Sequence, residues 1–186
     1  SPSAGGTSQP QVAQQQEAPP IDSFWIADFK AELVGFKLED VEEPIVVLHF
    51  WASWLPAAYK SIPDIETLGQ WVEKNDLPVT ILTVNAGDSL TDVKRFLRTE
   101  ERDVPVVLDR DYKAAEAYGA NTLPMTVFIM DGKIQDAING YGEGFTQLVK
   151  TNINTLVGKL DQETSETDEQ PESDAPDQAD ADYLNP

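Results

Sequence analysis

Few side chains in this sequence could do chemistry. The chain has 186 residues, no cysteine and a single histidine, His49. Thiol–disulfide exchange needs a thiolate nucleophile, so no residue of this chain can carry it out. His49 lies inside the apolar run 45–51, where burial favours a neutral imidazole, and we interpret it as a core residue. Because no second histidine or cysteine could complete a zinc site, we expect no metal and no cofactor.

Three glycines, Gly140, Gly142 and Gly144, are a second candidate for a chemical site. They follow a predicted strand and precede a predicted helix, which is the setting of phosphate-binding loops. The spacing is Gly-x-Gly-x-Gly, however, and no lysine follows at the position that such loops require. We therefore interpret the cluster as an ordinary loop.

The charge of the chain restricts its partners. The formal net charge is −20 at pH 7. Residues 161–186 hold ten acidic residues and no lysine or arginine, and Glu17 adds one more charge, which leaves about −9 on residues 21–160. A surface of this sign repels phosphate backbones and anionic membranes, so we expect no nucleic acid partner. The acidic segment is interpreted as a solubilising extension; weak cation binding or contact with a basic partner is the alternative.

The elements that must position any site follow from the apolar pattern. Two continuous apolar runs, 45–51 and 79–84, predict buried strands, and helical spacing between them predicts a helix at about 57–75. Such a strand–helix–strand unit gives parallel strands with a right-handed crossover. The other predicted elements are a strand or hairpin within 29–41, a helix from 88 or 89 to 99, a strand at 104–108, a short helix at 111–118, a hairpin of strands 125–130 and 133–138, and a helix at 145–160.

Composition divides the chain into three segments. Residues 1–20 are rich in Ser, Gly, Pro and Gln, and residues 161–186 are acidic. Neither can bury enough apolar surface to offset the cost of ordering its backbone. We predict a disordered N-terminal linker at 1–20, one domain at 21–160 and a disordered acidic tail at 161–186. No segment has 18 consecutive apolar residues, so none is expected to span a bilayer. The polar start at Ser1 suits an exported protein or a domain whose membrane tether was removed, and it would equally suit an arbitrary boundary of the sequence.

Residues 50–60, Phe-Trp-Ala-Ser-Trp-Leu-Pro-Ala-Ala-Tyr-Lys, resemble the active-site segment of the thioredoxin superfamily, in particular of the TlpA/ResA-type extracytoplasmic thioredoxins. That family has Cys-x-x-Cys after Phe-Trp-Ala-(Ser/Thr)-Trp, and the two cysteine positions here hold Leu55 and Ala58. Pro63 matches the proline that kinks the family's active-site helix. Leu123-Pro124 matches its cis-proline loop, and residues 109–119 and 131–134 match further landmarks. The resemblance covers about residues 45–150.

This resemblance implies an α/β thioredoxin fold, in which a central mixed β-sheet is flanked by helices on both faces. In active members the first cysteine lies at a helix N-terminus that stabilises its thiolate, and the second resolves the mixed disulfide. Leu55 and Ala58 can do neither, so we expect no catalytic residue. His49 falls where thioredoxin has a buried aspartate that relays protons to the resolving cysteine, a role without a substrate here. A peroxidase of the related peroxiredoxin type also requires a cysteine and is excluded for the same reason.

The function we expect is binding of another protein or an extended peptide through the former active-site face. In relatives the cis-proline loop pairs with a substrate backbone like an added strand. A leucine in place of a thiol makes this face more apolar, and exposed apolar patches mark contact sites. We expect Trp51 to lie in the core. The predicted binding residues are Trp54, Leu55, Pro56, Ala57, Leu123 and Pro124.

The alternative is a TlpA/ResA-type thiol–disulfide oxidoreductase whose active-site cysteines were replaced in this sequence. Ala58 is compatible with such a replacement. Leu55 argues against it, because thiols are normally removed by substitution to serine or alanine. Under both hypotheses the resemblance implies an extracytoplasmic location, either periplasmic or tethered to a membrane.

Overall fold

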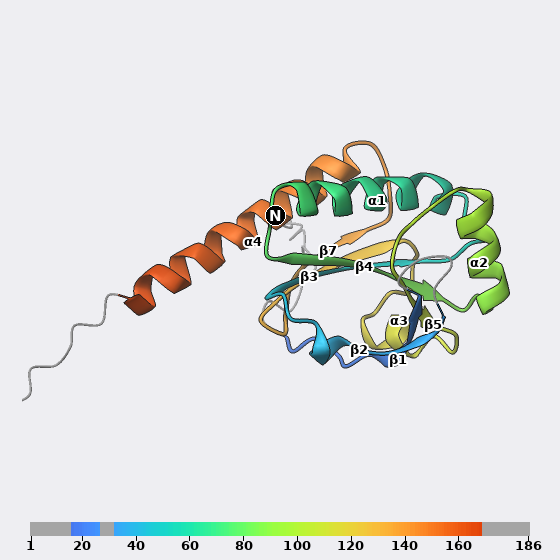
Figure 1. Ribbon diagram of the computed structural model, residues 1–186, viewed down its shortest axis with the longest axis horizontal. Helices are drawn as coiled ribbons and strands as arrows, with labels where there is room; N and C mark the ends of the chain where they lie inside the picture. The colour runs from blue at the N-terminus through green and yellow to red at the C-terminus, as the bar shows by residue number, and fades with distance from the viewer. Residues whose placement is uncertain (1–15, 27–31, 169–186) are drawn as a thin grey trace, which may run out of the picture.

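The computed structural model describes residues 16–26 and 32–168. Within these residues seven strands form one sheet in the order β2-β1-β5-β4-β3-β6-β7 (Figure 1). The central strands β3, β4 and β5 are parallel, and β6, β7, β1 and β2 are antiparallel to their neighbours. The strands are β1 Asp22–Ile26, β2 Val34–Lys37, β3 Ile45–Trp51, β4 Val79–Ala86, β5 Val106–Asp109, β6 Met125–Met130 and β7 Lys133–Asn139. The mixed sheet confirms the predicted fold class.

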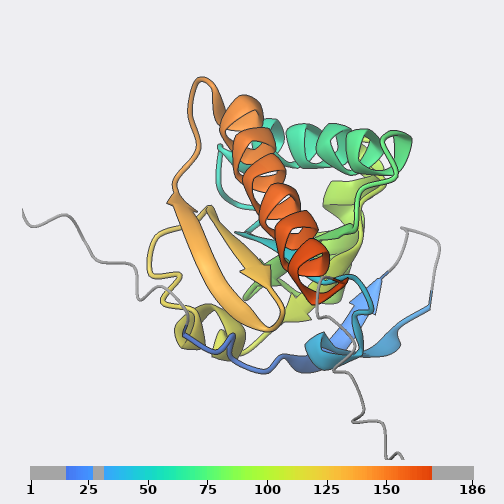
Figure 2. The ribbon, with the colours of Figure 1, turned by 90° about the vertical axis from the view of Figure 1, so that its left-hand side faces the viewer.

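Helices cover both faces of this sheet. They are α1 Ala58–Lys74, α2 Leu90–Thr99, α3 Lys113–Ala117 and α4 Phe145–Asp168, and a short 3-10 turn, η1, spans Leu38–Asp40. Helices α1 and α4 lie on one face, with α2 at the same side, and α3 lies on the opposite face (Figures 1 and 2). None of the described helices is long and apolar enough to cross a membrane.

Strand β3 is the centre of the core, because its side chains are buried on both faces. Val46 and Leu48 pack with the residues around α3, whereas Ile45 and Val47 pack with α1 and α4. Alternation along a strand sends successive side chains to opposite faces, so a strand covered on both sides reads as a continuous apolar run. This is why the sequence of β3 could be assigned without a structure.

The hairpin of β6 and β7 turns at Asp131 and Gly132, as the sequence predicts. Both residues have positive φ, of 50° and 75°. A two-residue turn of this kind needs positive φ at both central positions, which Asp-Gly adopts at low cost. The hairpin places β6 beside β3, with Met125 opposite Phe50. The residue before β6, Pro124, is thereby brought to the end of β3.

Two element limits differ from those expected. The upstream hairpin begins at Asp22, earlier than the predicted 29–41, and residues 27–31 between its strands lie outside the described residues. Helix α4 continues to Asp168, so residues 161–168 of the predicted disordered tail are helical. The apolar pattern stops at Leu160, but an exposed helix needs no apolar face to extend by a few turns once a packed helix has nucleated it. The remainder of the acidic segment, 169–186, lies outside the described residues.

The end of the predicted N-terminal linker contacts the domain. The Ala18 N–H donates to Gly132 O at 2.8 Å, and the Ile134 N–H donates to Gln16 O at 2.8 Å. The Tyr118 hydroxyl donates to Pro19 O at 2.7 Å. In each bond the linker takes part through a backbone group, so its side-chain composition, rich in Pro and Gln, does not reveal the contact. Residues 1–15 of the predicted linker lie outside the described residues.

Candidate functional site

The turn between β3 and α1 is the former active-site segment. The Leu55 N–H donates to Ala52 O at 3.2 Å, and the Ala58 N–H donates to Leu55 O at 3.0 Å, so the chain coils directly into α1. Trp51, in β3, is fully buried and packs against Phe96 of α2 with ring centroids 5.0 Å apart. Trp54, in the turn, is 65% exposed. The two tryptophans therefore have different roles, one in the core and one at the surface.

The two former cysteine positions differ in environment. Ala58 is 1% exposed at the start of α1. Leu55 is half-buried and packs against the apolar cluster between α1 and α2, together with Leu90. Leu55 is therefore only partly exposed at this face. Its side chain packs partly inward, because the cluster around Trp51 and Phe96 offers apolar contact to a longer side chain at this position.

The Leu123–Pro124 peptide bond is cis, as the sequence predicts. Pro124 is buried, and its carbonyl accepts the Gly140 N–H at 2.8 Å. Leu123 is half-buried. Within the described residues, neither its N–H nor its C=O takes part in a backbone hydrogen bond. An unpaired backbone beside a sheet can pair with an added extended chain.

A groove of about 510 Å³ lies next to this turn. Pro56 and Ala57 line it from the turn before α1, Lys60 lines it from α1, and Tyr141, Gly142 and Glu143 line it from the loop before α4. The glycine-rich segment is thus a loop, as predicted, and it forms one wall of a groove. Sequence reasoning missed Lys60, Tyr141 and Glu143 as lining residues, because they lie far apart along the chain and belong to no motif.

A hydrogen bond ties the two walls of the groove together. The Tyr141 hydroxyl donates to Asp64 Oδ2 at 2.7 Å, joining the loop to α1. The bond to the Asp64 carboxylate raises the pKa of Tyr141 to about 12. Tyr141 also packs against Phe145 at the start of α4, with ring centroids 5.1 Å apart. The tyrosine stays protonated at neutral pH and holds the loop against the helix.

His49 is a core residue, as the sequence analysis expects. It is fully buried in β3, with Nδ1 2.9 Å from Thr126 Oγ1 and Nε2 3.1 Å from Ser61 Oγ. The Phe145 ring meets it edge-on at 5.8 Å. Burial lowers the pKa of His49 from 6.5 to about 3. Because the neutral imidazole is fully buried and both its nitrogens face hydroxyls, it does not contact a ligand at the surface.

A buried carboxylate that the sequence analysis considered only as a possible helix start supports the turn. Asp88 follows β4 and is 9% exposed. Its Oδ2 accepts the Ser53 N–H at 2.7 Å and an N–H of the Asn85 side chain at 2.7 Å. Asp88 precedes the N-cap of α2 and reads in the sequence as a capping residue. Only the packing of two loops shows that it binds the former active-site turn.

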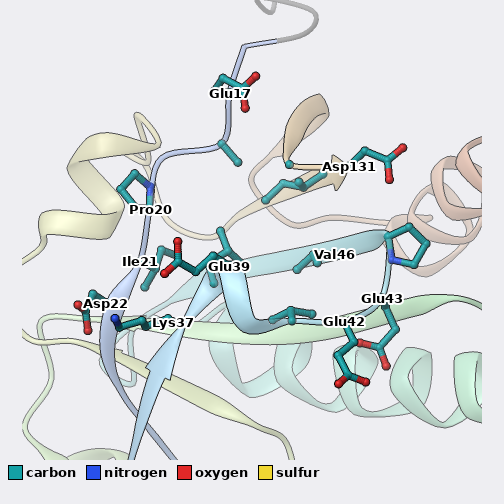
Figure 3. Close-up of a pocket in the computed structure, with 16 residues that line it drawn as sticks. Glu17, Pro20, Ile21, Asp22, Lys37, Glu39, Glu42, Glu43, Val46 and Asp131 are labelled. Atoms are coloured by element: carbon teal, nitrogen blue, oxygen red, sulfur yellow. The ribbon is translucent and has the colours of Figure 1, made fainter.

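A second groove, of about 480 Å³, lies at the opposite end of β3, beside Pro44 and Val46 (Figure 3). Carboxylates from three segments surround it, including Glu17, Glu39 and Asp131. Among the described residues, no group of three or more histidine, cysteine, aspartate or glutamate side chains is placed to hold a metal ion. This acidic groove is separate from the turn after β3, because the two lie at opposite ends of the strand.

Comparison with known proteins identifies one family and a group of similar sequences. The AhpC/TSA family model matches residues 16–137. The chain is 30% identical over 135 residues to the thiol-disulfide oxidoreductase ResA of Halalkalibacterium halodurans, covering 69% of this chain and 74% of that protein. It is 28% identical over 130 residues to ResA of Bacillus subtilis, covering 69% of each.

Solved structures share the fold at lower identity. A putative thiol:disulfide interchange protein DsbE from Chlorobium tepidum superposes with a TM-score of 0.67 at 21% identity, covering 77% of this chain and 97% of that one. The exposed lipoprotein thioredoxin Etrx1 of Streptococcus pneumoniae gives a TM-score of 0.60 at 24% identity, covering 73% and 100%. These similarities show a thioredoxin-like fold. The family match includes strands β1 to β6, the former active-site turn and the cis-proline loop, and it ends within β7. The chain is therefore a member of the AhpC/TSA family with ResA-like relatives and no cysteine.

Proposed function

We propose that this chain is a redox-inactive binding module that holds another protein or an extended peptide against its former active-site face. The observation that carries the proposal is that this face, without cysteines, offers an exposed aromatic side chain and an unpaired backbone segment. Trp54 is 65% exposed, and the backbone groups of Leu123 have no backbone partner within the described residues. Both features are suited to contact with a chain, and neither depends on a thiol.

The face combines two kinds of contact. An exposed aromatic side chain gives a large apolar anchor, and such anchors carry much of the energy of an interface. The free backbone beside β6 gives pairing with an extended chain that is independent of sequence. The groove lined by Pro56, Ala57 and Tyr141 adds a place for a side chain of that partner. Leu55, next to Trp54 in the chain, is half-buried and leaves part of its side chain exposed at this face.

The alternative is an oxidoreductase whose cysteines were replaced in this sequence, and the ResA relatives support it. The packing of Leu55 against the cluster between α1 and α2 favours the binding module. A leucine that packs against its neighbours supports a role for this position that needs no thiol. An extracytoplasmic location is part of the proposal, and it is supported by the exposed lipoprotein thioredoxin among the similar structures.

Selection from a random-peptide library, with the whole chain immobilised, tests the proposal. Enriched peptides are titrated into labelled protein and followed by NMR. We expect the largest shifts at Trp54 and Leu123, and Trp54→Ala to weaken binding about tenfold or more. Phe24→Ala is the matched control, because Phe24 is 56% exposed in β1, away from this face. Equal loss of affinity in both variants would contradict the proposal.

The rival site is the acidic C-terminal segment. Contacts made by exposed charges weaken steeply with salt, because ions screen them. Affinities are therefore compared at low and high salt for Trp54→Ala and for a chain ending at Leu160. If the shortened chain loses affinity while Trp54→Ala binds as the parent does, the acidic segment is the binding element and the proposed face is not.

A further inference from the structure

Asp88 occupies an unusual position for an unpaired carboxylate. It is 9% exposed, and in the part of the chain that the structure describes no lysine or arginine forms an ion pair with it. A buried charge is retained at a cost unless hydrogen bonds satisfy it. Here the bonds come from Ser53, in the turn after β3, and from Asn85, in β4. The charge is therefore placed where it holds two separate segments together.

The loop that carries Asp88 is itself fixed on both sides. Asn85 is 1% exposed in β4, and its Oδ1 accepts the Asp88 N–H at 3.3 Å. The Gly87 N–H donates to Asp109 O at 2.9 Å, and the Tyr112 side chain lies against Gly87 so closely that a Cβ there would clash. After Asp88, the Ser89 hydroxyl caps α2 by accepting the Asp92 N–H at 3.1 Å. A carboxylate mounted on so constrained a loop can set the position of the segment it binds.

We propose that Asp88 is the positioning residue of the former active-site face. Its carboxylate fixes the backbone of the turn at Ser53, and this holds the next residue, Trp54, in its exposed position. This inference rests on the proposed binding function, because it assigns to Asp88 the geometry of the surface that the partner meets. Ser53 directly precedes Trp54 and follows the end of β3 by two residues. Charge-assisted bonds to a backbone N–H are roughly twice as strong as neutral ones, so this one bond restrains the turn strongly.

The test compares two buried carboxylates that make similar bonds. Asp88→Ala removes the acceptor of the Ser53 N–H, and Asp88→Asn keeps an amide oxygen in its place. Asp109→Ala is the matched control, because the Asp109 side chain is buried and accepts the N–H groups of Ala114 and Ala115 on the opposite face, whereas the Gly87 N–H bonds to the backbone carbonyl that the variant keeps. Hydrogen exchange at the Ser53 amide, fluorescence anisotropy of Trp54 and affinity for a library-selected peptide are measured in each variant.

We expect Asp88→Ala to accelerate hydrogen exchange at the Ser53 amide about tenfold or more and to lower the anisotropy of Trp54. The affinity for the library-selected peptide should fall by a similar factor. Asp88→Asn should rescue part of each effect, and it serves alone if the alanine variant does not fold. Asp109→Ala should change Ser53 exchange no more than its loss of global stability requires. Equal Ser53 exchange in Asp88→Ala and Asp109→Ala overturns the inference, as does unchanged peptide affinity in Asp88→Ala.

The two proposals fail separately in this design. If the library yields no peptide that shifts the Trp54 resonances of the parent chain, the binding function is contradicted. Exchange at Ser53 and anisotropy of Trp54 need no peptide, so they still decide whether Asp88 holds the turn.

Discussion

At the scale of single residues, Leu55 is a packed apolar side chain at a position where the family has a cysteine. Its side chain is half-buried against the cluster that includes Trp51 and Phe96. Leucine has no reactive group, so truncation of Leu55 removes apolar contact and no reactivity. The residue therefore contributes to stability as well as to the surface of the former active site.

We predict that Leu55→Ala lowers the free energy of unfolding by about 1–2 kcal/mol, less than for a fully buried leucine because the side chain is only partly enclosed. Leu148→Ala is the control, since Leu148 is 48% exposed in α4 and its truncation should cost below about 0.5 kcal/mol. Urea denaturation of both variants gives the comparison. Equal losses of unfolding free energy in Leu55→Ala and Leu148→Ala would contradict the inward packing of Leu55.

His49 gives a prediction about pH. Burial lowers its pKa from 6.5 to about 3, so between these values the unfolded chain binds a proton that the folded chain does not. Stability contributed by neutral His49 is therefore present above pH 6.5 and is lost as the pH falls toward 3. The loss approaches about 1.4 kcal/mol per pH unit.

The variant His49→Asn isolates this effect, because its carboxylates titrate as in the parent. We expect the difference in unfolding free energy between parent and variant to shrink steadily as the pH falls below 6.5. Urea denaturation over that range measures it. Parallel pH profiles of the two proteins would show that His49 is charged in the fold or accessible to solvent.

At the scale of elements, the N-terminus of α1 keeps the geometry that a dithiol site needs. The Ala58 N–H bonds to Leu55 O at 3.0 Å, which brings these two positions within one turn. Positive charge density at a helix N-terminus favours a thiolate there.

We predict that Leu55→Cys combined with Ala58→Cys forms an intramolecular disulfide under oxidant and that the thiol at position 55 has a pKa below its usual range. Mass spectrometry detects the bond, and the pH dependence of alkylation reports the thiolate. The single variant Leu55→Cys should form no intramolecular bond. A double variant that stays reduced would mean that the turn has lost the family geometry.

At the scale of the whole molecule, the two ends of the domain differ. Residues 16–20 are joined to the hairpin of β6 and β7 and to Tyr118 by hydrogen bonds, and Ile21 is 4% exposed. The side chains of residues 161–167 in α4 are all exposed. The first end therefore stabilises the domain, and the second does not.

We predict that a chain beginning at Ile21 is less stable than one beginning at Gln16 by about 2–3 kcal/mol, because the hydrogen bonds to the hairpin and Tyr118 are lost. A chain ending at Leu160 should have the thermal midpoint of the full chain to within about a degree or two, because removing exposed residues changes the free energy of unfolding by about zero. Thermal denaturation followed by circular dichroism compares the four chains. A large drop after truncation at Leu160 would show that the end of α4 packs on the domain.

Much of this fold was readable from local patterns. The continuous apolar run of β3, the Asp-Gly turn after β6 and the serine before α2 each determine structure within a few residues, so the sequence predicts the order of strands and helices. The absence of cysteine also settles, by chemistry alone, that this chain cannot exchange disulfides. Pro124 was identified as a cis position because the segment resembles a known family, not through spacing.

Only the tertiary structure determined how the site is supported. Asp88 reads as a helix cap, Tyr141 as part of a glycine loop and Leu55 as an exposed replacement, because each is judged against its neighbours in sequence. Packing brings Asp88 to Ser53 and Tyr141 to Asp64, across separations of 35 and 77 residues. Which distant groups meet depends on the layering of helices over the whole sheet, and no local periodicity encodes it. The sequence therefore determined the elements and the lost chemistry, and the fold determined the shape of the surface that remains.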